Sequence, residues 1–349
     1  MSPVLTPAPT SISDPDGRPL YGTYQGALGA IGLGSLKGEH QLGFSARVAR
    51  RKRWIYTFVA TPEVIALYSI ADLSYTANAF ALVVDLKDKK VLVDETFLVP
   101  PGPHATVGDR PSQGLAAHFF GLPAQLAATR PEGDDRFHQT VRLGRLRPFP
   151  SLALSWKGAL LAAGGPPPLT AIAPVEGGGV NVTQKWAGLL AFGSLEAGGR
   201  RYLLDGGVGG MDYTQGYLAR HTAWRWAFAC GRLDDGTPLG VNLVEGFNEG
   251  GPANENAVWI GGALYPVGRA HFTYQRGDVL EPWAISTDDG AVHLTMKPIA
   301  VHRDDRDLKL VKSHFAQPVG LFEGTVRVGG QTYVVRGVPG VTEDQDILW

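Results

Sequence analysis

This sequence has a single cysteine and no excess of charge of either sign, and each of these features excludes a class of protein. Cys230 is the only cysteine among the 349 residues, which rules out an intrachain disulfide and a multi-cysteine zinc site. The 32 basic and 33 acidic residues leave a net charge of −1, so no overall field attracts the chain to nucleic acid or anionic lipid. No nucleic-acid partner is therefore expected.

Long apolar runs are missing as well. No uninterrupted apolar stretch approaches the roughly 20 residues that span a bilayer, so we expect no integral membrane association. Residues 1–16 lack the charged and apolar regions of a signal peptide, and the single cysteine fits a reducing compartment, which together predict a cytoplasmic location. Residues 47–53 form the main basic run, which we interpret as a solvated turn before a strand.

Glycine and proline are abundant and divide the chain into short segments, since 46 glycines and 25 prolines are spread along it. Residues 223–232 alternate, with Trp224, Trp226, Phe228 and Cys230 on one predicted strand face. Turn residues 234–236 then lead into a second strand at 239–247. Further strands are predicted at 54–60, 64–70, 73–84, 91–98, 257–260, 263–274, 283–286, 291–297, 324–328 and 331–336.

Strands and turns without helical periodicity predict an all-β protein built as antiparallel barrels or sandwiches. The length fits two domains. A Pro- and Gly-rich break in composition at 164–179 places the boundary. We therefore expect a flexible N-terminal tail at 1–19, a first domain at 20–175 and a second at 176–349, in a monomer or a homodimer.

Motifs for cofactors and metals are absent from the sequence. The glycine-rich residues 26–34 lack the strand, helix and acidic residue of a dinucleotide-binding loop. There is no Walker A, HExxH or GxSxG motif. The nine histidines, among them His293, His302 and His314, lack paired metal-ligand spacing. We expect neither a cofactor nor a metal.

Several segments carry a resemblance to known families. Met211-Asp212-x-x-x-Gly216 precedes the Trp-x-Trp strand and the turn at 233–236, and residues 322–326 with 337–343 resemble a closing W-E-G-x-V…G-x-G-x-x-E stretch. In these respects the chain is similar to the carotenoid 1,2-hydratase (hydroxyneurosporene synthase-like) superfamily. It resembles even more closely a bacterial lipocalin-like family known only as a domain of unknown function, through Arg53-Trp54, Asp72-Leu73, Phe247-Asn248 and residues 255–259.

This resemblance implies two lipocalin-like antiparallel β-barrel domains packed together, and chemistry in which an acid protonates an isoprenoid double bond. Asp212 matches the acidic residue of the D-H-x-W-G motif, which is the proposed proton donor, while Tyr213 and Gln215 replace its histidine and tryptophan. Protonating an alkene requires a neutral carboxylic acid, and burial in an apolar barrel raises the pKa of a carboxyl group.

Candidate site residues come mainly from the second half. The catalytic candidates are Asp212, Glu323, Glu245 and Tyr213. Candidates for substrate binding combine rings that stabilise a cation with polar groups that orient a ligand oxygen or water, namely Trp224, Trp226, Trp259, Trp283, Arg225, Asn242, Asn248, Glu255, Asn256 and His221. The tryptophans also fit core packing, Asp212 a turn, and Arg225 an ion pair with Glu245 or Asp212.

Two functions are carried forward from the sequence. The first is a cofactor-free enzyme, a hydratase or other lyase, an isomerase or a cyclase, acting on a lipophilic small molecule of isoprenoid or polyketide type with Asp212 as the general acid. The alternative is a non-catalytic carrier of a lipid or pigment. A third and weaker alternative is a structural role, which the absence of any pocket above about 300 Å³ would support.

Overall fold

The computed structural model describes residues 5–145, 151–249, 251–307, 309 and 311–349, and its regular structure is almost entirely β. Within the described residues, no helix is both long and apolar enough to cross a bilayer. The helical segments described are η1 (Leu33–Ser35), η2 (Gly38–His40) and α1 (Phe44–Arg50).

Among the described residues, the first of two large sheets contains fifteen strands. Its main path runs β6-β5-β4-β3-β15-β13-β11-β10-β9-β8-β7, and four further strands pair beside this path. Its strands are β1 (Thr6–Pro7), β2 (Gly22–Gln25), β3 (Arg51–Ala60), β4 (Val64–Asp72), β5 (Ala77–Asp85), β6 (Lys90–Val99), β7 (Ala105–Val107), β8 (Leu115–Gly121), β9 (Ala124–Arg130), β10 (Arg136–Arg145), β11 (Ser151–Leu161), β12 (Leu169–Val175), β13 (Gly179–Ala197), β14 (Arg200–Leu203) and β15 (Val208–Tyr217).

The second sheet, as far as the structure describes it, contains ten strands in the order β19-β18-β17-β16-β25-β24-β22-β21-β20, with β23 beside β24. Its strands are β16 (His221–Arg232), β17 (Pro238–Glu245), β18 (Ala257–Ile260), β19 (Ala263–Pro266), β20 (Ala270–Thr273), β21 (Trp283–Thr287), β22 (Val292–Arg303), β23 (Arg306–Asp307), β24 (Lys312–Val328) and β25 (Gln331–Leu348).

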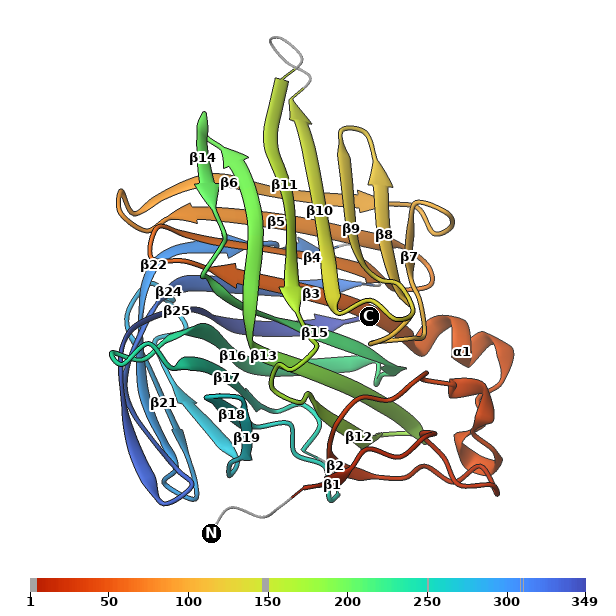
Figure 1. The fold of residues 1–349 in the computed structure, drawn as a ribbon. Coiled ribbons are helices and arrows are strands. Elements are labelled where there is room, and N and C mark those ends of the chain that lie inside the picture. The colour runs from red at the N-terminus through yellow and green to blue at the C-terminus, as the bar shows by residue number, and fades with distance from the viewer. Residues whose placement is uncertain (1–4, 146–150, 250, 308, 310) are drawn as a thin grey trace.

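Each sheet curls over a core of its own. In the first sheet β4 contacts β7 and β8, and Figure 1 shows β8–β11 standing across β3–β6. In the second sheet β17 contacts β20. Trp156 and Phe137 lie in the first core, and Trp283 and Met296 lie in the second. The predicted fold of two lipocalin-like antiparallel barrels is confirmed.

A further apolar layer joins the two barrels, and β16 shows how the sequence pattern produces it. Trp226 and Phe228 pack in this layer, whereas Ala227 and Ala229 pack into the core of the second barrel. Both faces of the strand are therefore buried, with the large rings between the barrels and the small side chains inside one of them.

The change from one sheet to the other comes later in the chain than residue 175. Strands β13 and β15 pair with β11 and β3, so the first sheet extends to Tyr217. The Pro- and Gly-rich stretch at 164–179 contains β12, which pairs with β13 and β2. Composition suggests a linker there, but the backbone of these residues completes the first sheet.

Two other segments differ from their predicted structure. Within residues 5–19, β1 pairs with β2 and Ile12 is fully buried, so this segment is packed onto the first barrel. The basic run at 47–53 forms the end of α1 and the start of β3, where the Lys52 side chain is buried. The Arg50 guanidinium donates to three backbone carbonyl groups, those of Glu176, Gly177 and Leu218.

Candidate functional site

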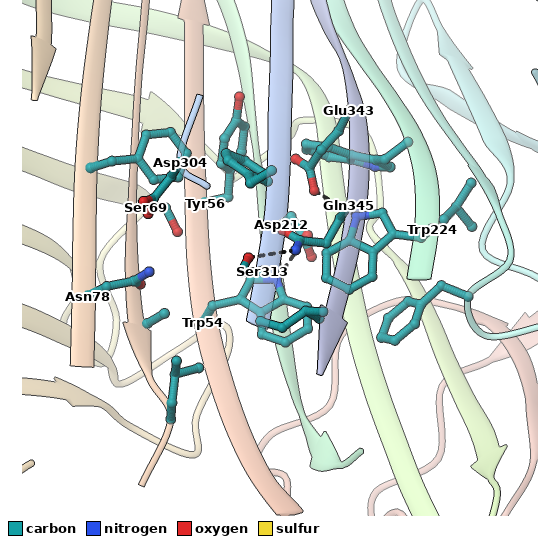
Figure 2. Close-up of a pocket in the computed structure, with 18 of the residues that line it drawn as sticks. Trp54, Tyr56, Ser69, Asn78, Asp212, Trp224, Asp304, Ser313, Glu343 and Gln345 are labelled. Carbon is teal, nitrogen blue, oxygen red and sulfur yellow. Dashed lines mark hydrogen bonds between the residues drawn. The ribbon is translucent and has the colours of Figure 1, made fainter. Parts of the chain in front are cut away.

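A cavity of about 150 Å³ lies between the two barrels. Figure 2 shows Ser69 and Asn78 of the first barrel on one side, and Trp224 and Glu343 of the second on the other. A cavity of this volume holds one ring of the size of benzene. More open hollows of about 710 and 730 Å³ lie elsewhere on the molecule.

Strands β3 and β16 contribute an aromatic ladder to this region. The rings of Trp54 and Trp224 stack with centroids 6.2 Å apart and planes 14° apart. Tyr56 packs edge-on against Trp226 at 5.1 Å, a favourable arrangement for aromatic pairs. Two residues further along each strand, Phe58 and Phe228 make the same edge-on contact at 5.9 Å. Both strands thus carry the pattern Trp-x-aromatic-x-Phe.

The strand beside each half of the ladder contributes a carboxyl group in the same register. Asp212 of β15 lies opposite Tyr56, and Glu343 of β25 lies opposite Trp226. The Trp54 indole Nε1 donates to Asp212 Oδ2 at 3.3 Å, and Trp224 Nε1 donates to Glu343 Oε1 at 2.6 Å. The two barrels therefore present equivalent half-sites to one cavity (Figure 2).

The two half-sites differ chemically because different residues contact the carboxyl groups from the adjacent strands, β13 in the first barrel and β24 in the second. Lys185 of β13 pairs with Asp212, with Nζ 2.8 Å from Oδ1, and its Nζ lies 3.4 Å from Glu255 Oε2. Burial acts to lower the pKa of Lys185, but the two carboxylates raise it above its ordinary value. In the second barrel Gln317 takes the corresponding place, and its Nε2 donates to Glu343 Oε2 at 2.9 Å. Asp212 therefore has a cationic partner, whereas Glu343 is held by neutral donors.

Glu343 is a buried carboxyl group that titrates near neutral pH. Burial raises its pKa to about 7, the hydrogen bonds from Gln317 and Trp224 offset part of this rise, and the charge of Asp212 adds to it. Burial likewise raises the pKa of Glu255, and Lys185 opposes that rise. A carboxylic acid that holds its proton near pH 7 is a group that can protonate a ligand.

The raised pKa of Glu343 predicts that the protein loses stability as pH rises through neutrality. Between the ordinary pKa of 4.5 and about 7 the folded state binds more protons than the unfolded state, so the free energy of unfolding decreases with pH. The loss contributed by Glu343 is about 3 kcal/mol between pH 4.5 and pH 8. Denaturant titrations of the wild type and E343Q at both pH values check this. The difference between the two proteins isolates Glu343, because the other titratable groups contribute equally to the pH dependence of both. An equal pH dependence in both proteins would contradict it.

Four residues singled out from the sequence line the cavity, namely Asp212, Trp224, Trp226 and Glu255. Three asparagines that do not line the cavity form hydrogen bonds around these residues. Asn242 accepts a hydrogen bond from Trp226 Nε1 at 2.8 Å and donates to the backbone of Glu255. Asn256 accepts from the backbone of Val244, and Asn248 pairs with Asn181. These amides fix the positions of the groups that face the cavity.

Three of the remaining acid and histidine candidates lie at the surface, away from the cavity. Glu323 is exposed and pairs with Lys297 at 2.6 Å. Glu245 lies beside His271, and the exposed His221 pairs with Asp346.

The other candidates lie in structural positions outside the cavity lining. Tyr213 points into the first barrel, where its hydroxyl donates to the carbonyl of Gly108, because alternate residues of β15 face opposite sides. Arg225 pairs with Asp344, and not with Glu245 or Asp212 as the sequence suggested. Trp283 stacks on Tyr274 in the second core, and Trp259 donates to the carbonyl of Pro167.

Sequence reasoning did not select several groups that define the cavity, chiefly Glu343, Lys185, Trp54 and His302. The signal that could have found them is the shared pattern Trp-x-aromatic-x-Phe at 54–58 and 224–228. Two strands with the same pattern are expected to have similar side chains on the strands beside them. Within the described part of the chain, no group of three or more His, Cys, Asp and Glu side chains is placed to hold a metal ion.

Solved structures with a similar fold have little sequence in common with this chain. CghA with Sch210972 has a TM-score of 0.54 at 12% identity, covering 86% of this chain and 89% of that one. A putative AttH from Nitrosomonas europaea has a TM-score of 0.49 at 12% identity, covering 88% and 96%. Kievitone hydratase from Nectria haematococca has a TM-score of 0.46 at 11% identity, covering 88% and 92%.

The curated proteins contain no significant match to this sequence. A family model does match, over residues 5–349, and its description is "Domain of unknown function (DUF2804)". Because this match extends over almost the whole length, from β1 in the first barrel to the end of the second, the chain belongs to the DUF2804 family.

Proposed function

We propose that this protein binds a small molecule by a ring-sized apolar group in the cavity between its barrels and catalyses proton transfer to that molecule, with Glu343 as the acid. The observation that carries the proposal is a carboxyl group with a pKa of about 7, held by neutral donors in an aromatic-lined cavity. Acid-catalysed hydration, isomerisation and cyclisation of an unsaturated ligand each begin with such a protonation.

The two half-sites divide the roles of their carboxyl groups. In enzymes, two titratable groups whose environments give them different pKa values commonly serve as the acid and the base. Lys185 compensates the charge of Asp212, whereas the neutral partners of Glu343 leave it able to carry a proton. The role of general acid that the sequence suggested for Asp212 is thus better filled by Glu343, and Asp212 is left to orient the ligand.

The lining also limits the ligand. Trp54, Trp224 and Phe247 supply ring faces, which favour an apolar group and stabilise positive charge developing next to them. Ser69 and Asn78 add polar groups on the opposite side (Figure 2). Because the cavity holds only about 150 Å³, a longer isoprenoid or polyketide chain would place one ring-sized portion inside and extend the rest outward.

Ligand identification tests this proposal. Purified protein is incubated with a small-molecule extract, and bound and altered species are identified by mass spectrometry. We expect the wild type to retain a ring-containing molecule and convert it, and E343Q to retain the same molecule unconverted. Retention without conversion by the wild type would contradict the enzyme and favour a carrier.

A further inference from the structure

His302 belongs to the same row of side chains as Glu343. It lies on β22 opposite Gln317 of β24, and Gln317 in turn bonds Glu343 of β25. Two strand spacings separate His302 from Glu343, a backbone distance of about 10 Å. Both residues line the cavity, so a ring-sized ligand placed between them would have a carboxyl group at one end and an imidazole ring at the other.

The imidazole ring of His302 is held rigidly by its neighbours. It stacks on Phe80 with centroids 4.7 Å apart and planes 13° apart, and Phe315 packs against it edge-on at 5.7 Å. Its Nδ1 lies 2.5 Å from Asp94 Oδ1, and the His302 side chain is only 3% exposed. In a neutral imidazole ring, a carboxylate that accepts a hydrogen bond from Nδ1–H leaves the lone pair on Nε2.

The second nitrogen of this ring has no partner in the described part of the chain. His302 Nε2 is buried and makes no hydrogen bond with any residue that the structure describes. Buried polar atoms in folded proteins are nearly always hydrogen-bonded, so a nitrogen without a partner in a residue that lines a cavity indicates a partner supplied by something else. Because His302 is part of the cavity lining, a molecule bound in the cavity can supply this partner.

We propose that His302 Nε2 accepts a hydrogen bond, and then a proton, from an O–H group of the molecule bound in the cavity. This inference rests on the proposed function and adds a base to its acid. The ligand O–H bond breaks, its electron pair stays on oxygen, and the proton moves to Nε2, giving an imidazolium ion next to Asp94. Glu343 gives its proton to another atom of the ligand, so the ligand is isomerised without a change in charge. Proton exchange with water restores both groups.

The contact between His302 and Asp94 also connects β22 of the second barrel to β6 of the first, and the test must separate this structural role from ligand recognition. Phenol and toluene serve as probes, because both fit a ring-sized cavity and only phenol has an O–H donor. Calorimetric titration measures the dissociation constants of both for the wild type and for H302F, which keeps a stacked ring. The matched control is H314F, because His314 forms an exposed pair with Asp305 outside the cavity lining.

We expect the preference for phenol over toluene to fall about 3- to 10-fold in H302F and to stay unchanged in H314F, which corresponds to one hydrogen bond. Binding of both probes with an unchanged preference in H302F would overturn the role of His302 and leave the proposed function standing. Failure of both probes to bind the wild type would overturn both proposals.

A measurement on the unaltered protein covers the case in which H302F does not fold. In protein labelled with ¹⁵N-histidine, the His302 ring is expected to show an unprotonated Nε2 whose resonance moves with phenol and not with toluene. A protonated Nε2, or one that phenol leaves unmoved, would overturn the proposal.

Discussion

Replacing Lys185 by methionine is expected to lower the free energy of unfolding by about 3–5 kcal/mol, because breaking a buried ion pair leaves an uncompensated charge. Lys185 is 3% exposed, and its partners Asp212 and Glu255 are 6% and 1% exposed, so the carboxylates left behind are largely shielded from bulk water. Methionine keeps most of the apolar length of the side chain, which limits the loss to the charge. Denaturant titration of K185M against the wild type measures the difference.

The matched control for K185M is K297M. Lys297 also pairs with a glutamate, Glu323, at 2.6 Å, but both side chains are about half exposed. An exposed pair of this kind contributes about 0–1 kcal/mol. Adding E255Q to K185M should recover part of the loss, since it removes one of the two carboxylates left without a cation. Equal losses in K185M and K297M would mean that water reaches the Lys185 cluster.

Replacing Glu343 by glutamine is expected to reduce turnover of the identified substrate by 10²–10⁴-fold, the usual contribution of a general acid. Binding should persist, because the amide can still accept from Trp224 Nε1, and its NH₂ group can donate to Gln317 after that amide turns over. The measurement is kcat and KM of the wild type and E343Q from pH 5 to pH 9. Activity of the wild type should fall as pH rises above about 7, where Glu343 loses its proton.

Two further variants separate the roles of the carboxyl groups. E323Q changes an exposed carboxylate outside the cavity and should leave kcat unchanged. D212N removes the partner of Lys185 and should cost stability as well as activity, because it breaks the buried pair from its other side. If D212N abolished turnover at unchanged stability while E343Q stayed active, Asp212 would be the acid and our assignment would be wrong.

The strands of the fold could be predicted because they follow from local patterns. Alternation at 223–232 corresponds to β16, and the turn at 234–236 leads into β17 as expected. The boundary could not be predicted in this way, since the proline- and glycine-rich stretch before β13 resembles a linker in composition. Hydrogen bonds between β12, β13 and β2 place it in the first sheet, and such long-range pairings leave little trace in local composition.

The candidate site was predicted in part, and the reason lies in strand register. Asp212, Trp224, Trp226 and Glu255 were selected, and they line one cavity. Glu323 and Glu343 both belong to the closing segment on which the family resemblance rests, yet Glu323 is exposed and Glu343 is buried against Trp224. Which acid of this segment faces inward depends on the pairing of β24 and β25 with their neighbours, and the sequence does not state that pairing.

The amino-acid sequence by itself determined the all-β class, the turns, the strand faces and the identity of the protonatable groups, because these depend on neighbours along the chain. The tertiary structure alone decided that Lys185 contacts Asp212 while Gln317 contacts Glu343, and that His302 keeps a nitrogen without a partner among the residues the structure describes. The physical reason is that a proton's affinity for a carboxyl group depends on burial and on charges a few ångströms away, and those neighbours come from strands distant in sequence.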